Sequence, residues 1–193
     1  ADRAMSDGVP LVHDSVPNNT VVDVQMFATE GIDEIFDDAH TVVSVRSRTG
    51  RQNALPLETR GCIAYWDDRD EQLIVHICTQ VPHQVRTVTA LCLGLDERQV
   101  RVVVPDMGGG FGQKCVVGRE EIAVAAAALK LRRPVKWIED RKDALTASFL
   151  AREQQYDVRA AFDSEGHILG LDADVVCDMG AYSCYPFTAG IEP

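Results

Sequence analysis

The chain has 193 residues, of which 46% are hydrophobic and 25% are charged, an ordinary balance for a globular protein. Its net charge of −11 argues against nucleic acid or an anionic membrane surface as a partner, and no apolar run reaches the length of a membrane-spanning helix. The six cysteines form no C-x-x-C pair, which favours reduced, buried thiols in a cytoplasmic protein over metal ligation by the chain itself.

The first part of the chain predicts a linker followed by short elements. Residues 1–19 are polar and contain two prolines, which favours an extended linker. Residues 21–27 alternate loosely and predict a strand, and residues 30–39 predict a short acidic helix. Residues 41–48 alternate apolar with polar side chains, as a half-exposed strand does.

A second unit is expected from residue 55 onward. Residues 62–66 and 72–78 predict a hairpin, because a charged turn separates two apolar runs. Pro82 suits the first turn of a helix that continues to Gly94. We therefore expect residues 1–54 to form a linker with the N-terminal part of the region, and residues 55–193 to form the main domain portion.

The rest of the chain alternates strands with helices. Residues 100–104 predict a buried strand and residues 118–131 a buried, alanine-rich helix. Further strands, a short helix and a second hairpin are predicted at residues 135–138, 141–148, 154–162 and 168–176. Because hairpins occur beside strand–helix alternation, the fold class is predicted to be α+β, with mixed sheets, hairpins and packed helices.

A glycine-rich segment, Gly108-Gly109-Gly110-Phe111-Gly112-Gln113-Lys114, joins the strand at 100–104 to the helix at 118–131. Each glycine permits positive φ and close backbone approach, so successive amides can converge on one guest. Phe111 supplies a wall. Lys114 is expected to add positive charge near a helix N-terminus, which predicts an anionic ligand.

Two nucleotide-binding motifs do not fit this segment. The phosphate loop of nucleotide hydrolases places Ser or Thr after its lysine, whereas Cys115 follows Lys114 here. The dinucleotide fingerprint G-x-G-x-x-G lacks its last glycine. A glycine-rich turn without any ligand remains an alternative from the residues alone.

Gln80 ends a predicted strand directly before the helix that starts at Pro82, a place where polar side chains face a cleft. A primary amide offers donors and an acceptor without charge, which suits an oxygen on a metal cofactor. The alternative is a glutamine that bonds nearby backbone. Cys115 is open to two interpretations, a reactive thiol at a helix N-terminus or a small inert one.

The glycine segment resembles the molybdopterin loop of the molybdenum hydroxylase family, which contains xanthine dehydrogenase, aldehyde oxidase and carbon monoxide dehydrogenase. Six further segments resemble the same family in order and spacing: Leu57-Glu58-Thr59-Arg60-Gly61, Thr79-Gln80-Val81-Pro82-His83-Gln84-Val85-Arg86, Arg133-Pro134-Val135-Lys136-Trp137, Glu139-Asp140-Arg141, Ala151-Arg152-Glu153-Gln154 and Asp178-Met179-Gly180-Ala181-Tyr182. Seven linked segments are far more specific than any one of them.

The resemblance implies a molybdopterin-binding-domain-like fold and part of the large subunit of a molybdenum-dependent oxidoreductase. Such an enzyme hydroxylates an aldehyde or N-heteroaromatic, or oxidises carbon monoxide, with oxygen from water. Its cofactor is molybdenum–molybdopterin, in some members as the cytosine dinucleotide. Electrons leave through Fe–S and FAD partner subunits or domains. The cofactor's sulfurs hold the metal, so no protein ligand to the metal is expected.

By the same resemblance, Gln80 matches the glutamine that hydrogen-bonds an oxygen on molybdenum, and Gly109, Gly110, Phe111 and Gly112 match the loop whose backbone approaches the cofactor. Cys115 stands where xanthine dehydrogenases carry a substrate-binding glutamate, which argues against purine hydroxylation. The family's catalytic glutamate is expected beyond Pro193, so the 193-residue chain alone is expected to be inactive. A non-catalytic domain whose glycine loop binds an anion or peptide is the alternative hypothesis.

Overall fold

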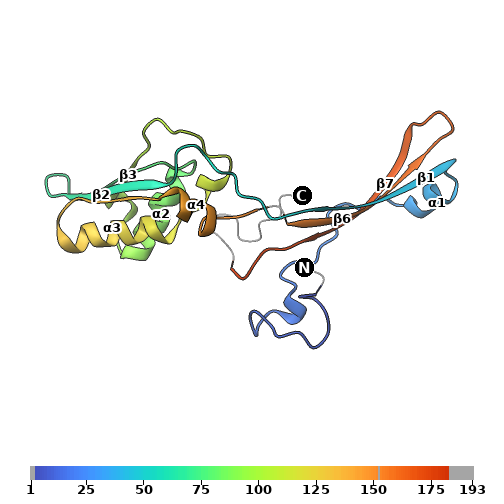
Figure 1. Cartoon of the computed structure of the whole chain (residues 1–193), viewed down its shortest axis with the longest axis horizontal. Helices are drawn as coiled ribbons and strands as arrows, with labels where there is room; N and C mark the ends of the chain where they lie inside the picture. The colour runs from blue at the N-terminus through green and yellow to red at the C-terminus, as the bar shows by residue number, and fades with distance from the viewer. Residues whose placement is uncertain (1–2, 152, 183–193) are drawn as a thin grey trace. The chain divides into compact units, whose positions relative to one another are not determined.

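The computed structural model describes residues 3–151 and 153–182 (Figure 1). Contacts between backbone positions divide the described residues into two compact units. The first unit contains residues 3–52 and 153–182, and the second contains residues 53–151.

The first unit is built on a three-stranded antiparallel sheet in the order β1-β6-β7 (Figure 1). Its strands are β1 (Thr41–Thr49), β6 (Gln154–Phe162) and β7 (Ile168–Cys177). The helix α1 (Ile32–Asp37) packs on one face at Gly170, where an added Cβ would lie 3.1 Å from the Ile32 side chain and 3.2 Å from that of Ile35. A glycine in β7 therefore lets this helix approach the sheet closely.

The predicted strand at residues 21–27 is wrong. The structure assigns no strand to this segment, and its apolar side chains are exposed, including Phe27 at 87%. Loose alternation alone does not make a strand, because a strand also needs a neighbour to pair with its backbone.

Residues 153–182 belong with the first unit because β6 pairs with β1 over its whole length, from Thr41 opposite Phe162 to Thr49 opposite Gln154. The sequence pattern had grouped these residues with the main domain portion. The domain boundary after residue 54 stays a prediction.

The second unit contains a four-stranded mixed sheet in the order β4-β3-β2-β5. The antiparallel strands are β2 (Gly61–Asp67), β3 (Gln72–Ile77) and β5 (Val135–Ile138), and β4 (Val100–Val103) runs parallel to β3. Its α-helices are α2 (Pro82–Leu93), α3 (Arg119–Leu131) and α4 (Arg141–Thr146).

The helix α2 provides the crossover that a parallel β3–β4 pair requires. It begins at Pro82, whose ring presets helical φ, and ends before Gly94, which adopts φ of 66° as a left-handed C-cap. Both ends agree with the prediction from the sequence.

One face of this sheet forms the core beneath α2 and α3. Alternate residues of β2 and β3 point into it, including Ala64, Leu73 and Val75, and Val85 of α2 and Ala128 of α3 close it from the other side. The small alanine side chains of α3 let the helix lie close to the strands.

The prediction of a buried strand at residues 100–104 holds only in part. β4 lies at the edge of the sheet, with Val100 buried and Arg101 exposed. The predicted α+β class, both hairpins and the helices at 82–94 and 118–131 are confirmed. Within the described ranges, no helix is long and apolar enough to cross a membrane.

Candidate functional site

The glycine loop, residues 105–114, leaves β4 and enters α3 through a short 3-10 turn, η3 (Gln113–Cys115). Its backbone adopts positive φ at Gly109 (96°), Phe111 (51°) and Gly112 (84°). A phenylalanine with positive φ is strained, and the Phe111 side chain is nevertheless 73% exposed. The loop therefore keeps the Phe111 backbone in a conformation that non-glycine residues disfavour, with the aromatic ring exposed at the surface.

Gln80, between β3 and α2, lies against this loop. Its side-chain Oε1 accepts a hydrogen bond from the backbone N–H of Gly112 at 3.1 Å. Gly110 is buried and lies beside the same side chain. An added Cβ at Gly110 would be 2.5 Å from Gln80 Cδ. The structure thus brings together Gln80 and the loop residues, which the sequence singled out separately.

Several donors at this place have no hydrogen-bond partner among the residues that the structure describes. The backbone N–H groups of Gly109, Gly110 and Phe111 make no hydrogen bond to any residue that the structure describes. The same holds, within those ranges, for the Gln80 side-chain amide nitrogen. Its orientation follows from chemistry, since the Gly112 N–H needs an acceptor and so selects the carbonyl oxygen.

The expected role of Lys114 as a cation for an anionic ligand is wrong. Its side chain is 1% exposed, and its Nζ pairs with Glu58 Oε2 at 2.8 Å. The hydrogen bond from Lys114, with a second from the Gly108 N–H, holds the pKa of Glu58 below its usual value. The lysine charge is therefore buried inside the second unit and paired with a carboxylate.

A buried polar network supports the loop where it leaves toward α3. The Gln113 amide donates to Ser148 Oγ at 2.6 Å and to Asn53 Oδ1 at 3.3 Å. Ser148 in turn donates to Glu139 Oε1 at 3.4 Å. Because these groups are largely buried and bonded, they fix the exit of the loop.

Arg60 organises a buried charge cluster next to this network. Its guanidinium contacts Glu139 at 2.9 Å and Glu121 at 3.4 Å, and all three side chains are nearly inaccessible. Glu121 Oε2 has no hydrogen-bond partner among the described residues. Burial raises the pKa of Glu121 above its usual value, although Arg60 opposes the shift.

Sequence reasoning missed these supporting charges as functional groups. Glu58 and Arg60 entered only through the resemblance of their segment, and Glu121 lay within a helix assigned from its alanines. The sequence signal that could have indicated them is the position of these charged residues beside apolar runs. Nothing local shows that Glu58 meets Lys114, 56 residues away.

Thiols and histidines add no second site in the part of the chain that the structure describes. No group of three or more His, Cys, Asp or Glu residues there could hold a metal ion. Burial raises the pKa of the Cys62 thiol to about 12, so this cysteine is a neutral core residue. Cys115 follows the loop lysine with intermediate exposure.

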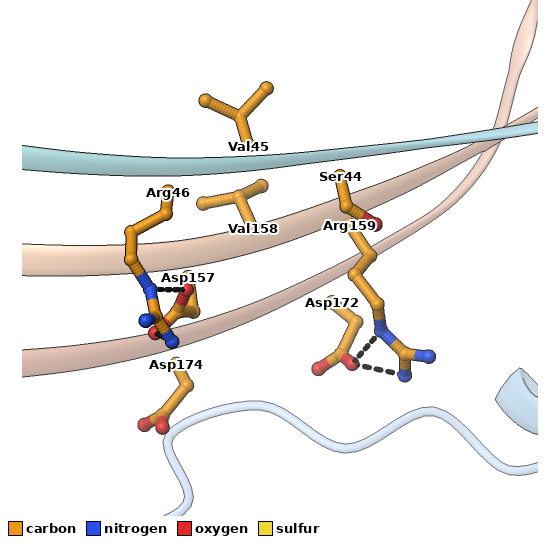
Figure 2. A pocket seen from close by; sticks show the side chains of 8 residues that line it. All are labelled: Ser44, Val45, Arg46, Asp157, Val158, Arg159, Asp172 and Asp174. Atoms are coloured by element: carbon orange, nitrogen blue, oxygen red, sulfur yellow. Dashed lines mark hydrogen bonds and ion pairs between the residues drawn. The ribbon is translucent and has the colours of Figure 1, made fainter.

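The first unit carries a hollow on its sheet, lined by charged residues of β1, β6 and β7 (Figure 2). Arg46 pairs with Asp157 at 2.6 Å, and Arg159 pairs with Asp172 at 2.6 Å. These pairs link neighbouring strands across the sheet. Each arginine is therefore paired with a carboxylate on the neighbouring strand.

Comparison with known proteins gives a family match over most of the chain. Residues 12–191 match the family model described as molybdopterin cofactor-binding domain. The nicotine 6-hydroxylase large subunit of Paenarthrobacter nicotinovorans is 39% identical over 191 residues, which cover 98% of this chain and 23% of that protein. The carbon monoxide dehydrogenase large chain of Hydrogenophaga pseudoflava is 40% identical over 150 residues, covering 78% of this chain and 19% of that protein.

A solved structure agrees with the sequence matches. Quinoline 2-oxidoreductase from Pseudomonas putida 86 superposes with a TM-score of 0.75 at 39% identity, covering 81% of this chain and 20% of the other. The chain therefore spans about a fifth of the length of the relatives that it matches.

Proposed function

The chain belongs to the molybdenum hydroxylase family, within its molybdopterin cofactor-binding domain, and from this premise we propose that Gln80 and the glycine loop hold the cofactor. The observation that carries the proposal is the row of N–H groups at Gly109, Gly110 and Phe111 that lack a partner among the described residues and lie beside the Gln80 amide.

The residues present fit such a group. A large cofactor with oxygen and sulfur acceptors needs convergent donors, and the loop offers backbone N–H groups without side chains in the way. These donors carry no charge, since Lys114 is neutralised by Glu58. The cofactor brings its own ligands for the metal, so the proposal requires no metal-ligating side chain from residues 108–112.

When bound, the molybdenum–molybdopterin cofactor supplies two-electron oxidation chemistry in which water provides the oxygen. The chain's own contribution is orientation. The Gln80 amide nitrogen can donate toward the cofactor while its oxygen stays bonded to Gly112, so the side chain is held by one end and presents the other. Preorganised donors of this kind need no rearrangement at the moment of reaction.

For the intact protein, the proposal is hydroxylation of an aldehyde or N-heteroaromatic, or oxidation of carbon monoxide. Support comes from the relatives, whose names include a nicotine 6-hydroxylase and a carbon monoxide dehydrogenase. Phe111 is an exposed aromatic wall beside the donors, which favours a flat aromatic substrate among these classes. The catalytic glutamate of the family is expected outside this chain.

The proposal includes partners and the cofactor's form. Relatives carry the words large subunit or large chain in their names, which supports assembly with other subunits. We propose an Fe–S partner and an FAD partner that carry electrons away, and the cytosine dinucleotide form of the cofactor. A cytoplasmic location and a main domain portion starting at residue 55 belong to the same proposal.

The test is analysis of the intact protein purified with its partners. We expect stoichiometric molybdenum by elemental analysis, a cytidine nucleotide after acid release, and oxygen-18 from labelled water in the product from quinoline or an aldehyde. A protein without molybdenum or pterin would overturn the proposal and favour a non-catalytic domain that binds an anion or peptide.

A further inference from the structure

One carboxylate ties the two ends of the glycine segment together. Glu58 Oε2 accepts a hydrogen bond from the Gly108 N–H at 2.8 Å and another from Lys114 Nζ at 2.8 Å. The Glu58 N–H also donates to the Gly108 carbonyl oxygen at 3.3 Å. Glu58 therefore holds the first glycine and the lysine that closes the segment.

Lys114 extends the tie to the segment that carries Gln80. Its backbone carbonyl accepts from the Gln80 N–H at 2.9 Å and from Thr79 Oγ1 at 3.1 Å. Gln80 in turn accepts from Gly112 through its side chain. Lys114 thus contacts Glu58 through its side chain and the segment that follows β3 through its backbone.

We propose that Glu58 and Lys114 are positioning residues that hold the unpartnered loop amides against Gln80 and so determine how firmly the protein retains the molybdopterin cofactor; this inference rests on the proposed function. Neither residue needs to touch the cofactor. Their effect passes through the backbone of residues 108–112.

The loop needs such a tie because of its composition. Four of the five residues from 108 to 112 are glycine, the residue with the most backbone freedom to lose. Without a restraint at both ends, the segment would populate many conformations, and ordering it would lower the affinity for the cofactor.

The two members of the pair differ in burial, which predicts unequal effects of substitution. The Lys114 side chain is 1% exposed and that of Glu58 is 40% exposed. Glu58→Gln keeps an acceptor for Gly108 but leaves a buried lysine without a counter-charge. Lys114→Met leaves a Glu58 carboxylate that water can solvate. We therefore expect Lys114→Met to disturb the loop less than Glu58→Gln does.

The experiment compares Glu58→Gln, Lys114→Met and the double variant in the intact protein. We expect Glu58→Gln to speed amide exchange of peptides covering residues 106–114 on the order of tenfold, the change that about 1.4 kcal/mol produces. The variant whose loop exchanges amide hydrogens fastest should also contain the least molybdenum and pterin. The double variant should match Lys114→Met in both quantities, because both lack the bond between residues 58 and 114 and neither leaves a buried charge alone.

Glu97→Gln is the matched control. Glu97 pairs with Arg86 at 2.8 Å in the same unit, but both side chains are more than two-fifths exposed. This variant should leave loop exchange and molybdenum content unchanged.

Each outcome bears on the inference separately from the proposed function. Unchanged exchange in Glu58→Gln would overturn the inference, and so would faster exchange with full cofactor content. A double variant with wild-type exchange and wild-type cofactor content would also overturn it. Absence of molybdenum from the wild-type protein would instead overturn the proposed function and, with it, the cofactor part of this inference.

Discussion

At the scale of single residues, Gln80 has a divided role. Its carbonyl oxygen organises the loop through Gly112, and its amide nitrogen lacks a partner among the described residues. The sequence allowed two interpretations of Gln80, a side chain that faces a ligand or one that bonds nearby backbone. The structure shows the backbone bond directly, and the donor end remains available for the proposed ligand.

Gln80→Leu in the intact protein should lower turnover per molybdenum by about a hundredfold, because one preorganised donor is worth roughly 3 kcal/mol. The free energy of unfolding should change little, since the Gln80 side chain is exposed. The same exchange at the exposed Gln25 is the control. Turnover per molybdenum within twofold of wild type would count against the proposed role of Gln80.

Glu121 predicts a pH dependence of stability. Burial raises its folded-state pKa, so its contribution to stability is complete below the ordinary value of 4.5 and is lost as pH rises through the raised value. Glu121→Gln stays neutral and should lose this part of the pH dependence, becoming the more stable form at high pH. Urea unfolding of both chains at several pH values measures this, with the exposed Glu71→Gln as control. Parallel pH profiles for wild type and Glu121→Gln would contradict it.

How much of the site follows from the sequence depends on sequence distance. Gln80 and residues 108–112 were proposed as site residues because strand ends, Pro82 and clustered glycines are local signals. Glu58 and Lys114 were not paired, because their contact joins positions 56 residues apart. For the same reason, Lys114 was expected to face an anionic ligand, whereas its side chain is buried and pairs with Glu58.

At the scale of elements, the crossover β3–α2–β4 places Gln80 beside the loop. Gln80 follows β3, the loop follows β4, and the two strands are parallel neighbours. Their carboxyl ends therefore meet at one edge of the sheet. The sequence predicted both strands and the helix from periodicity and caps. It could not predict that β4 is an edge strand, because periodicity reports burial and not strand order.

Leu73 tests whether this crossover is held by the shared core. Leu73 of β3 is 0% exposed, whereas Leu91 of α2 is 80% exposed. Leu73→Ala should lower the free energy of unfolding by about 3 kcal/mol, and Leu91→Ala by less than about 0.5 kcal/mol. Equal losses in urea unfolding would show that the core assignment is wrong.

At the scale of the whole molecule, the first unit exposes an apolar sheet face. Val43, Val45, Leu171 and Val175 point to the same side of the β1-β6-β7 sheet and are between 39% and 62% exposed. The chain spans only about a fifth of its relatives' length, so most residues of those relatives lie outside the matched part.

The 193-residue chain by itself should self-associate through this face, since exposed apolar patches attract one another. Val45→Lys should reduce association in static light scattering and lower the binding of an apolar dye. Val21→Lys is the control, because Val21 is 57% exposed but lies outside the sheet. A wild-type chain that stays monomeric at high concentration would contradict this expectation.

The central claim is that the glycine loop and Gln80 together hold the cofactor, and Gly110→Ala tests it most directly. Gly110 is not among the glycines with positive φ, so the added methyl acts through its collision with Gln80 and not through backbone strain. Gly50→Ala is the matched control, because an added Cβ there meets nothing within 4 Å.

The measurement is molybdenum and pterin per subunit in the intact protein. We predict that Gly110→Ala loses cofactor while Gly50→Ala retains it, and that any cofactor left in Gly110→Ala turns over more slowly, since misplacement by about 1 Å costs about a hundredfold. Full occupancy with unchanged turnover in Gly110→Ala would contradict the account.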